Sequence, residues 1–199
     1  TAEPVDPCTT NDEDSMDLYI QPNPTANAGS DADICEDGSY TVDDASAENY
    51  TAVTWTHDGT GTIDDVATLT PTYNAGTGET GEVTLTLHAT AKLPCTIEGS
   101  DDMVITIQAK PTVDAGSDET ICEDGSYEIT DASASNYDGL TWSAGACDTK
   151  IPDVGDGEFS STTTLTTTYT PGEGDIEAGV VCLTLSAAAI DPCSVAAED

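Results

Sequence analysis

The sequence predicts an all-β protein in which two tandem β-sandwiches follow an N-terminal extended strand. Three observations lead to this fold class: an internal duplication, short alternating segments rich in Thr, Val and Ile between Gly, Asp and Asn turns, and seven cysteines against two histidines. The 199 residues suffice for one large domain or two of about 100 residues, and the duplication favours two. We expect an N-terminal segment over residues 1–24, a first sandwich over 25–110 and a second over 111–199.

The duplication relates residues from 25 onwards to residues from 112 onwards. Its strongest part is Ala28–Tyr40 over Ala115–Tyr127, where both copies contain Ala-Gly-Ser-Asp and Ile-Cys-Glu-Asp-Gly-Ser-Tyr. Trp55 aligns with Trp142, each after alternating apolar positions in the middle of its copy. Because a sandwich buries its large aromatic residue, we expect both indoles in the cores, beside the strand residues Leu85 and Leu183.

The two ends of the chain are out of phase with the repeat. The segment Cys8–Gln21 aligns with Cys95–Gln108, which is predicted to contain the last strand of the first sandwich, and the second copy shows no such strand after Cys193. A sandwich without an edge strand exposes an apolar groove that an extended segment can fill by β-strand addition. We therefore predict that residues of about 14 to 21 form a donor strand, with Met16, Leu18 and Ile20 on its buried face.

The charge balance excludes whole classes of ligand. Lys and Arg number 3 against 39 Asp and Glu, so the formal net charge of −36 repels nucleic acid and anionic membranes. A stretch of 18 apolar residues is also missing from the sequence, so we expect no direct membrane insertion. Other copies of the same chain, forming a homopolymer, are the expected partners.

Cysteine usage predicts disulfides and an extracellular or cell-surface location. The sequence contains no Cys-x-x-Cys pair, which argues against a zinc site and for an oxidising compartment. Cys147 and Cys182 occur only in the second copy, which favours a local bridge between them. Cys8 is left over, and both a free thiol and a bond to a neighbouring chain are open for it.

Two acidic clusters, one near the opening of each copy, are candidate calcium ligands, because calcium takes six to eight oxygen ligands. The alternative is a solvated acidic surface, since neither cluster has the spacing of the Asp-x-Asp-x-Asp-Gly loop. The residues are Asp31, Asp33, Glu36 and Asp37 in the first copy and Asp118, Glu119, Glu123 and Asp124 in the second. Ca²⁺ is the one cofactor considered.

Catalytic residues are not predicted. No triad or phosphate-loop motif is present, and His57 and His88 have no counterparts in the second copy. A carbohydrate-binding accessory module would need an exposed aromatic face, which is hard to build with Phe159 as the single Phe and 5% aromatic residues.

The two Ala-Gly-Ser-Asp and Ile-Cys-Glu-Asp-Gly-Ser-Tyr stretches resemble the PKD-like and immunoglobulin-like repeats of large secreted surface proteins and adhesins of Bacteroidota. The resemblance implies immunoglobulin-like sandwiches, a surface or filament-forming protein and no catalytic residues. It also implies that Cys35 bridges to Cys95 and Cys122 to Cys193. Together with the out-of-phase ends it predicts a filament subunit that assembles head to tail, with a segment of a giant covalent adhesin as the alternative.

Overall fold

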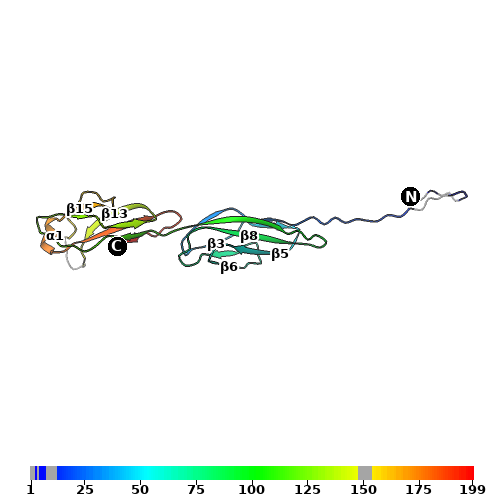
Figure 1. Ribbon diagram of the computed structural model, residues 1–199, viewed down its shortest axis with the longest axis horizontal. Helices are drawn as coiled ribbons and strands as arrows, with labels where there is room; N and C mark the ends of the chain where they lie inside the picture. Colours follow the sequence, from blue (N-terminus) through cyan, green and yellow to red (C-terminus); the bar gives the residue numbers. More distant parts are fainter. Residues whose placement is uncertain (1–2, 4, 8–12, 148–153) are drawn as a thin grey trace.

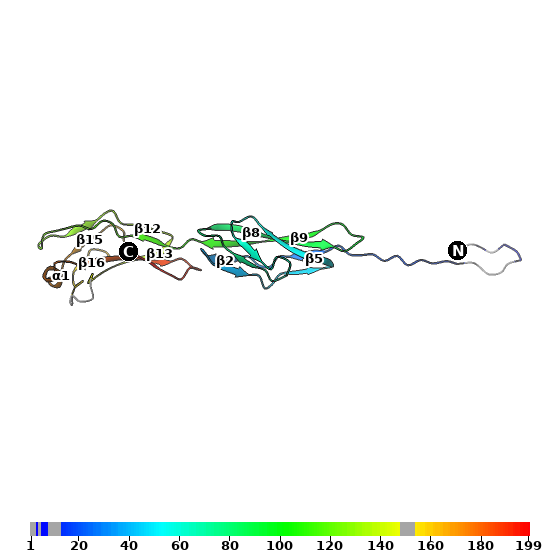
Figure 2. The same ribbon diagram turned by 90° about the horizontal axis from the view of Figure 1, so that it is seen from below.

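The computed structural model describes residues 3, 5–7, 13–147 and 154–199 and consists of two β-sandwich modules placed end to end (Figure 1). We call residues 25–110 module 1 and residues 111–199 module 2. The segment before module 1 runs away from it as an extended chain, so the molecule is a rod with a tail (Figures 1 and 2). No helix among the described residues is both long and apolar enough to span a bilayer.

Module 1 is a complete two-layer sandwich. One sheet has the order β2-β9-β8-β5, in which β2 runs parallel to β9 and the other pairs are antiparallel; the facing sheet is β3-β7-β6, and β1 pairs with β4. The strands are β1 (Thr25–Asn27), β2 (Ala32–Cys35), β3 (Ser39–Thr41), β4 (Ser46–Glu48), β5 (Tyr50–His57), β6 (Thr62–Asp64), β7 (Thr72–Asn74), β8 (Gly81–Ala91) and β9 (Gly99–Gln108).

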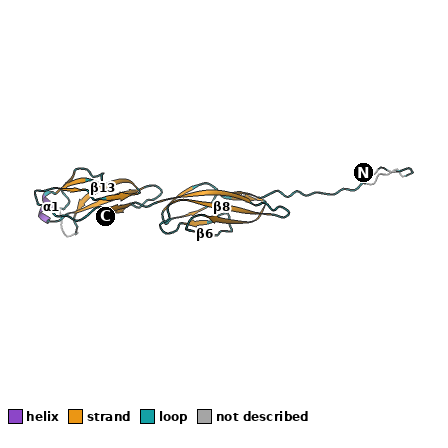
Figure 3. Ribbon diagram, viewed as in Figure 1, coloured by secondary structure: helices purple, strands orange, loops and turns teal. Residues whose placement is uncertain are grey.

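Module 2 repeats this plan with fewer paired residues. Its sheets are β13-β16-β17 and β11-β15-β14, with β10 paired to β12. The elements are β10 (Thr112–Asp114), β11 (Tyr127–Ile129), β12 (Ser133–Ser135), β13 (Tyr137–Gly145), β14 (Glu158–Phe159), β15 (Thr167–Thr170), α1 (Glu173–Ala178), β16 (Cys182–Ala189) and β17 (Ala197–Glu198). The short helix α1 stands out among the strands (Figure 3), and the sequence did not predict it. It ends at Gly179, whose φ of 75° suits a glycine C-cap.

The cores follow from the alternation of apolar residues along the long strands. In β8 every second side chain, from Val83 to Ala89, is buried against the facing sheet. The predicted burial of the tryptophans is confirmed, because Trp55 is 3% and Trp142 is 2% exposed. Each indole N–H also donates to a backbone carbonyl at 2.9 Å. Their cross-strand partners are Leu87 and Leu185, one inward-facing position along from the expected leucines.

The Ala-Gly-Ser-Asp stretch forms the turn that follows the first strand of each module, which is β1 in module 1 and β10 in module 2. Gly29 has a φ of 98°, a conformation that favours glycine, and a β-carbon there would collide with the Asp44 carboxylate. That carboxylate accepts hydrogen bonds from both the backbone N–H and the hydroxyl of Ser30, at 3.0 and 2.8 Å. Module 2 repeats the turn with Gly116, Ser117 and Asp131. The strongest part of the sequence repeat is therefore a folding motif.

Candidate functional site

The candidate site is an open groove in module 2, at the place that β2 and β9 occupy in module 1. The short strand β17 corresponds to the first two residues of β9 and pairs with Ser186 and Ala187 of β16. Beyond it, no strand among the described residues pairs with the edge of β16 that faces away from β13. Residues 119–122, which correspond to β2, form no strand either, since they lack the neighbour with which β2 pairs.

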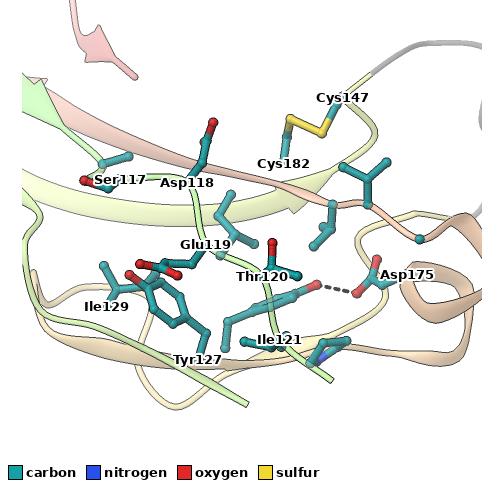
Figure 4. A pocket seen from close by; sticks show the side chains of 18 of the residues that line it. Ser117, Asp118, Glu119, Thr120, Ile121, Tyr127, Ile129, Cys147, Asp175 and Cys182 are labelled. Atoms are coloured by element: carbon teal, nitrogen blue, oxygen red, sulfur yellow. Dashed lines mark hydrogen bonds between the residues drawn. A yellow bond between two sulfur atoms is a disulfide. The ribbon is translucent and has the colours of Figure 1, made fainter. Parts of the chain in front are cut away.

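The groove has a volume of about 890 Å³ and is walled by residues 117–123 on one side and by the start of β16 on the other (Figure 4). Its floor is apolar and aromatic. The residues that line it include Ile121, Ile129, Trp142, Tyr169, Val181 and Leu183. A groove of this shape and lining accepts an extended peptide that supplies apolar side chains on one face.

Module 1 shows what a covered groove looks like in the same repeat. Ile34, on β2, is 7% exposed, whereas its counterpart Ile121 is 39% exposed. Val83 and Leu85, which lie beside β9 in the same sheet, are buried, whereas their counterparts Val181 and Leu183 are half-buried. The difference is the layer that Met103, Ile105 and Ile107 of β9 provide in module 1, where they are 0 to 2% exposed. Module 2 therefore presents an apolar surface and unpaired backbone groups that a strand would cover.

A buried acid closes one end of the groove. Asp175 in α1 is 3% exposed and accepts a hydrogen bond from the Tyr169 hydroxyl at 2.6 Å (Figure 4). It also accepts the Gly155 N–H at 2.6 Å and the Gly172 N–H at 3.0 Å. Burial opposes ionisation, but these hydrogen bonds outweigh it and hold the pKa of Asp175 below its ordinary value. Burial and the neighbouring carboxylate raise the pKa of Tyr169. Asp175 is a groove residue that sequence reasoning missed, although it follows Tyr169 by six residues as Glu79 follows Tyr73 in the first copy.

Module 1 has a related contact at a more solvent-exposed position. The Tyr73 hydroxyl donates to Glu79 at 2.8 Å, and Glu79 also accepts the backbone N–H groups of Gly76 and Thr60. Burial disfavours the ionised form of Glu79, yet these donors prevail and lower its pKa to about 2. The Glu79 side chain is half-buried, unlike Asp175.

The predicted donor residues lie in the extended segment before module 1. Met16, Leu18 and Ile20 are 83%, 77% and 85% exposed. Within the described part of the chain, residues 13–22 pair with no strand. The segment thus carries the apolar pattern of β9 in solvent, and its insertion into a neighbour stays a prediction.

The disulfides differ from the expected pattern. Cys35 bonds to Cys193 across the two modules, with Cα atoms 4.8 Å apart, so the predicted pairs Cys35–Cys95 and Cys122–Cys193 are wrong. The reason is the parallel pairing of β2 with β9, which puts Cys35 beside Gln108 at the end of β9 that faces module 2. Cys95 precedes the other end of this 10-residue strand, roughly 30 Å away, too far for a bridge.

The remaining cysteines fall into three groups. The predicted bridge between Cys147 and Cys182 is confirmed, with Cα atoms 5.0 Å apart. Among the described residues, Cys95 and Cys122 form no disulfide. Cys8 lies outside the described residues. Two disulfides are typical of a protein that folds in an oxidising compartment outside the cytosol.

The acidic clusters are spread over separate contacts. Asp31 accepts the Val104 N–H at 2.8 Å, while Glu36 accepts the Lys110 N–H at 3.0 Å and Asp37 pairs with the Lys110 ammonium at 2.7 Å. The second-copy acids Asp118, Glu119, Glu123 and Asp124 are exposed, and the first three of them line the groove. Over the described ranges, no three His, Cys, Asp or Glu side chains gather into a group that could hold a metal ion. Calcium binding stays a prediction from the sequence.

Comparison with known proteins agrees with the fold alone. No protein-family model and no curated protein matches the chain. Among solved structures, it is similar to the Protocadherin Gamma B2 extracellular cadherin domains 3-6 (TM-score 0.46, 16% identity, covering 88% of this chain and 46% of that one). It is also similar to the I-band fragment I67-I69 from titin (TM-score 0.47, 14% identity, covering 90% and 65%). The chain spans less than two thirds of either structure. The strand order of the chain itself establishes two β-sandwich modules.

Proposed function

We propose that this protein is a structural subunit of an extracellular filament or surface fibre, in which residues 14–21 of one molecule complete module 2 of the next. The observation that carries the proposal is the open groove beside β16, for which the exposed N-terminal segment holds the pattern of β9. The resemblance of the repeats to PKD-like modules of Bacteroidota surface proteins supports the same assignment. The protein is proposed to have no enzymatic activity.

The register of the inserted strand follows from module 1. There, Met103 lies opposite Leu85 and Ile105 opposite Val83 on β8. The repeat transfers these pairs to Met16 opposite Leu183 and Leu18 opposite Val181. On the other flank, Ile34 pairs with Ile107 in module 1, which places Ile20 beside Ile121.

The energy of insertion comes from both sides of the groove. Full burial of a Leu, Ile or Met side chain contributes roughly 1.5 to 3 kcal/mol, so the three donor side chains contribute roughly 5 to 9 kcal/mol together. Association costs about 4 to 15 kcal/mol before any contact is counted, so the donor side chains alone give at most weak binding. Two new strand ladders and the covering of Ile121, Val181 and Leu183 supply the remainder.

The contact joins two different surfaces of the molecule. The donor segment leaves the outer end of module 1, and the acceptor groove lies in the other module, so each molecule offers one of each (Figure 2). A heterologous head-to-tail contact of this kind propagates into an open chain of subunits. With a net charge of −36 per subunit, assembly should strengthen as salt screens the repulsion between molecules.

A pair of matched variants tests the proposal. Leu18→Asp puts a charge on the face of the donor strand that enters the groove, whereas Tyr19→Asp changes the opposite face, whose module 1 counterpart Thr106 is exposed. At about 0.15 M salt, light scattering and negative-stain microscopy should show elongated assemblies for the wild type and Tyr19→Asp and monomers for Leu18→Asp. A synthetic peptide of residues 13–22 should bind the Leu18→Asp monomer.

Two outcomes would overturn the proposal. Assembly that persists in Leu18→Asp would show that another surface joins the molecules. A wild-type protein that stays monomeric and binds no peptide would show that residues 14–21 are not the occupant of the groove, and a covalently following strand, as in a giant adhesin, would take their place.

A further inference from the structure

The joint between the two modules is held by a covalent bond between repeat-related positions. Cys35, the last residue of β2, belongs to the first module, and Cys193, in the turn after β16, belongs to the second. The sequence repeat equates Cys35 with Cys122 and Cys193 with Cys95. The two cysteines that form no disulfide among the described residues are therefore the counterparts of the two that staple the joint.

The surroundings of the cysteines repeat as closely as their positions. The Cys193 sulfur lies 3.4 Å from the Gln108 carbonyl, in the segment through which the chain enters module 2. The Cys95 sulfur lies 3.2 Å from the Gln21 carbonyl, in the corresponding segment through which the chain enters module 1. Gln21 is the repeat counterpart of Gln108. Cys95 thus sits against the end of the donor strand in the way that Cys193 sits against the end of β9.

We propose that Cys122 of one molecule forms a disulfide with Cys95 of the next, so that each joint of the filament is stapled like the joint inside the molecule. The inference rests on the proposed head-to-tail assembly. When residues 14–21 of the entering molecule lie in the groove in the register of β9, Cys95 of that molecule enters with them, because its sulfur contacts Gln21 at the end of the segment. In that register Cys95 approaches Cys122 as Cys193 approaches Cys35.

The same topology separates these two cysteines within one molecule. Cys95 lies at the outer end of module 1, next to Gln21. Cys35 lies at the end of module 1 that faces module 2, so its counterpart Cys122 lies at the end of module 2 that faces away from module 1. The length of the two modules therefore separates Cys95 from Cys122 within one molecule (Figure 1). A bond between Cys95 and Cys122 therefore reports a contact between two molecules.

The joint between molecules also lacks a contact that the internal joint has. Lys110 pairs with Asp37 at 2.7 Å in the internal joint. The repeat counterparts of these residues are Asn23 and Asp124, which cannot form an ion pair. The proposed disulfide thus lies at the joint between molecules, which lacks this ion pair.

The bond forms by thiol–disulfide exchange with a small-molecule disulfide of the glutathione type. The Cys122 thiolate attacks the oxidant and releases one of its sulfurs as a thiolate. The Cys95 thiolate then displaces the second sulfur from the mixed disulfide. Both protein thiols are oxidised to one S–S bond, and the oxidant leaves as two thiols that carry the two protons.

Oxidised assemblies of the full chain test the inference. With oxidised glutathione present, non-reducing gels should show a ladder of multimers that collapses with reductant, and peptide mapping should find Cys95 linked to Cys122. Cys95→Ser and Cys122→Ser should each abolish the ladder while microscopy still shows fibres. A mixture of the two variants should yield cross-linked dimers and nothing larger, because one copy keeps only Cys122 and the other only Cys95.

The results separate the two proposals. Fibres without a Cys95–Cys122 peptide, or with Cys95 linked to Cys8 instead, would overturn the staple and leave the donor-strand assembly standing. The absence of both fibres and cross-links would overturn both.

Discussion

Replacement of Tyr169 by Phe isolates the contribution of one hydrogen bond to a buried carboxylate. The substitution keeps the aromatic ring and removes the hydroxyl that donates to Asp175 at 2.6 Å. Asp175 is 3% exposed, so water cannot easily replace the lost donor, and the two glycine N–H groups remain as partners. Hydrogen bonds to charged groups contribute about 1.5 to 3 kcal/mol, and we expect module 2 to lose stability in this range.

Module 1 supplies the matched control. Tyr73→Phe removes the equivalent donor from Glu79, which is half-buried and can accept water instead. This bond is also to a charged group, but water can take the place of the lost donor, so the variant should lose less than about 1.5 kcal/mol. Since each module holds one tryptophan, urea unfolding followed by fluorescence in a Trp55→Phe background reports module 2, and in a Trp142→Phe background it reports module 1.

The dependence on pH provides a second test of the same contact. Because the pKa of Asp175 lies below its ordinary value of 3.8, the ionised carboxylate contributes stability that is complete above that value. This contribution is lost as the pH falls through the lower pKa of the folded state. The gap between wild type and Tyr169→Phe should therefore be widest at neutral pH and narrow in acid. Equal losses in the two modules, or a gap that is independent of pH, would refute the reasoning.

Two further predictions concern the backbone turn and the joint. Gly116→Ala should destabilise module 2 by about 1 to 3 kcal/mol in thermal melts, because its φ is 98° and its β-carbon would meet Asp131, whereas Gly139→Ala, with open space around it, should cost under about 1 kcal/mol. Cys35→Ser should speed proteolysis between residues 108 and 112 and, because the bridge closes a loop of 158 positions, should lower the free energy of unfolding by about 4 kcal/mol; protection of this linker in the variant would show that the bridge does not hold the joint.

The repeat made much of the architecture predictable. Local patterns predicted the strands, the two buried tryptophans and the bridge between Cys147 and Cys182, because each depends on the alternation of apolar residues or on a difference between the copies. The pairing of Cys35 was not predictable in this way. An alignment shows which residues are equivalent, and it does not show that β2 runs parallel to β9 and so places Cys35 at the joint.

The groove was predictable only in part. The sequence indicated a missing strand in the second copy and a matching one near the start of the chain. Asp175 follows Tyr169 by six residues, as Glu79 follows Tyr73, but the sequence did not indicate that Asp175 would be buried, because its burial depends on contacts with Gly155 and Tyr169. Such long-range contacts are set by the tertiary fold.

The bridge between Cys35 and Cys193 also decides how the protein responds to a pulling force. It joins residues 158 positions apart, and nearly all of both modules lies in the loop between them. Tension that enters before Cys35 and leaves after Cys193 passes through the sulfur atoms and bypasses that loop. At about 3.4 Å per extended residue, the bond withholds roughly 500 Å of chain from stretching. Once this disulfide is reduced, a pulling force can unfold both modules and extend the chain between Cys35 and Cys193.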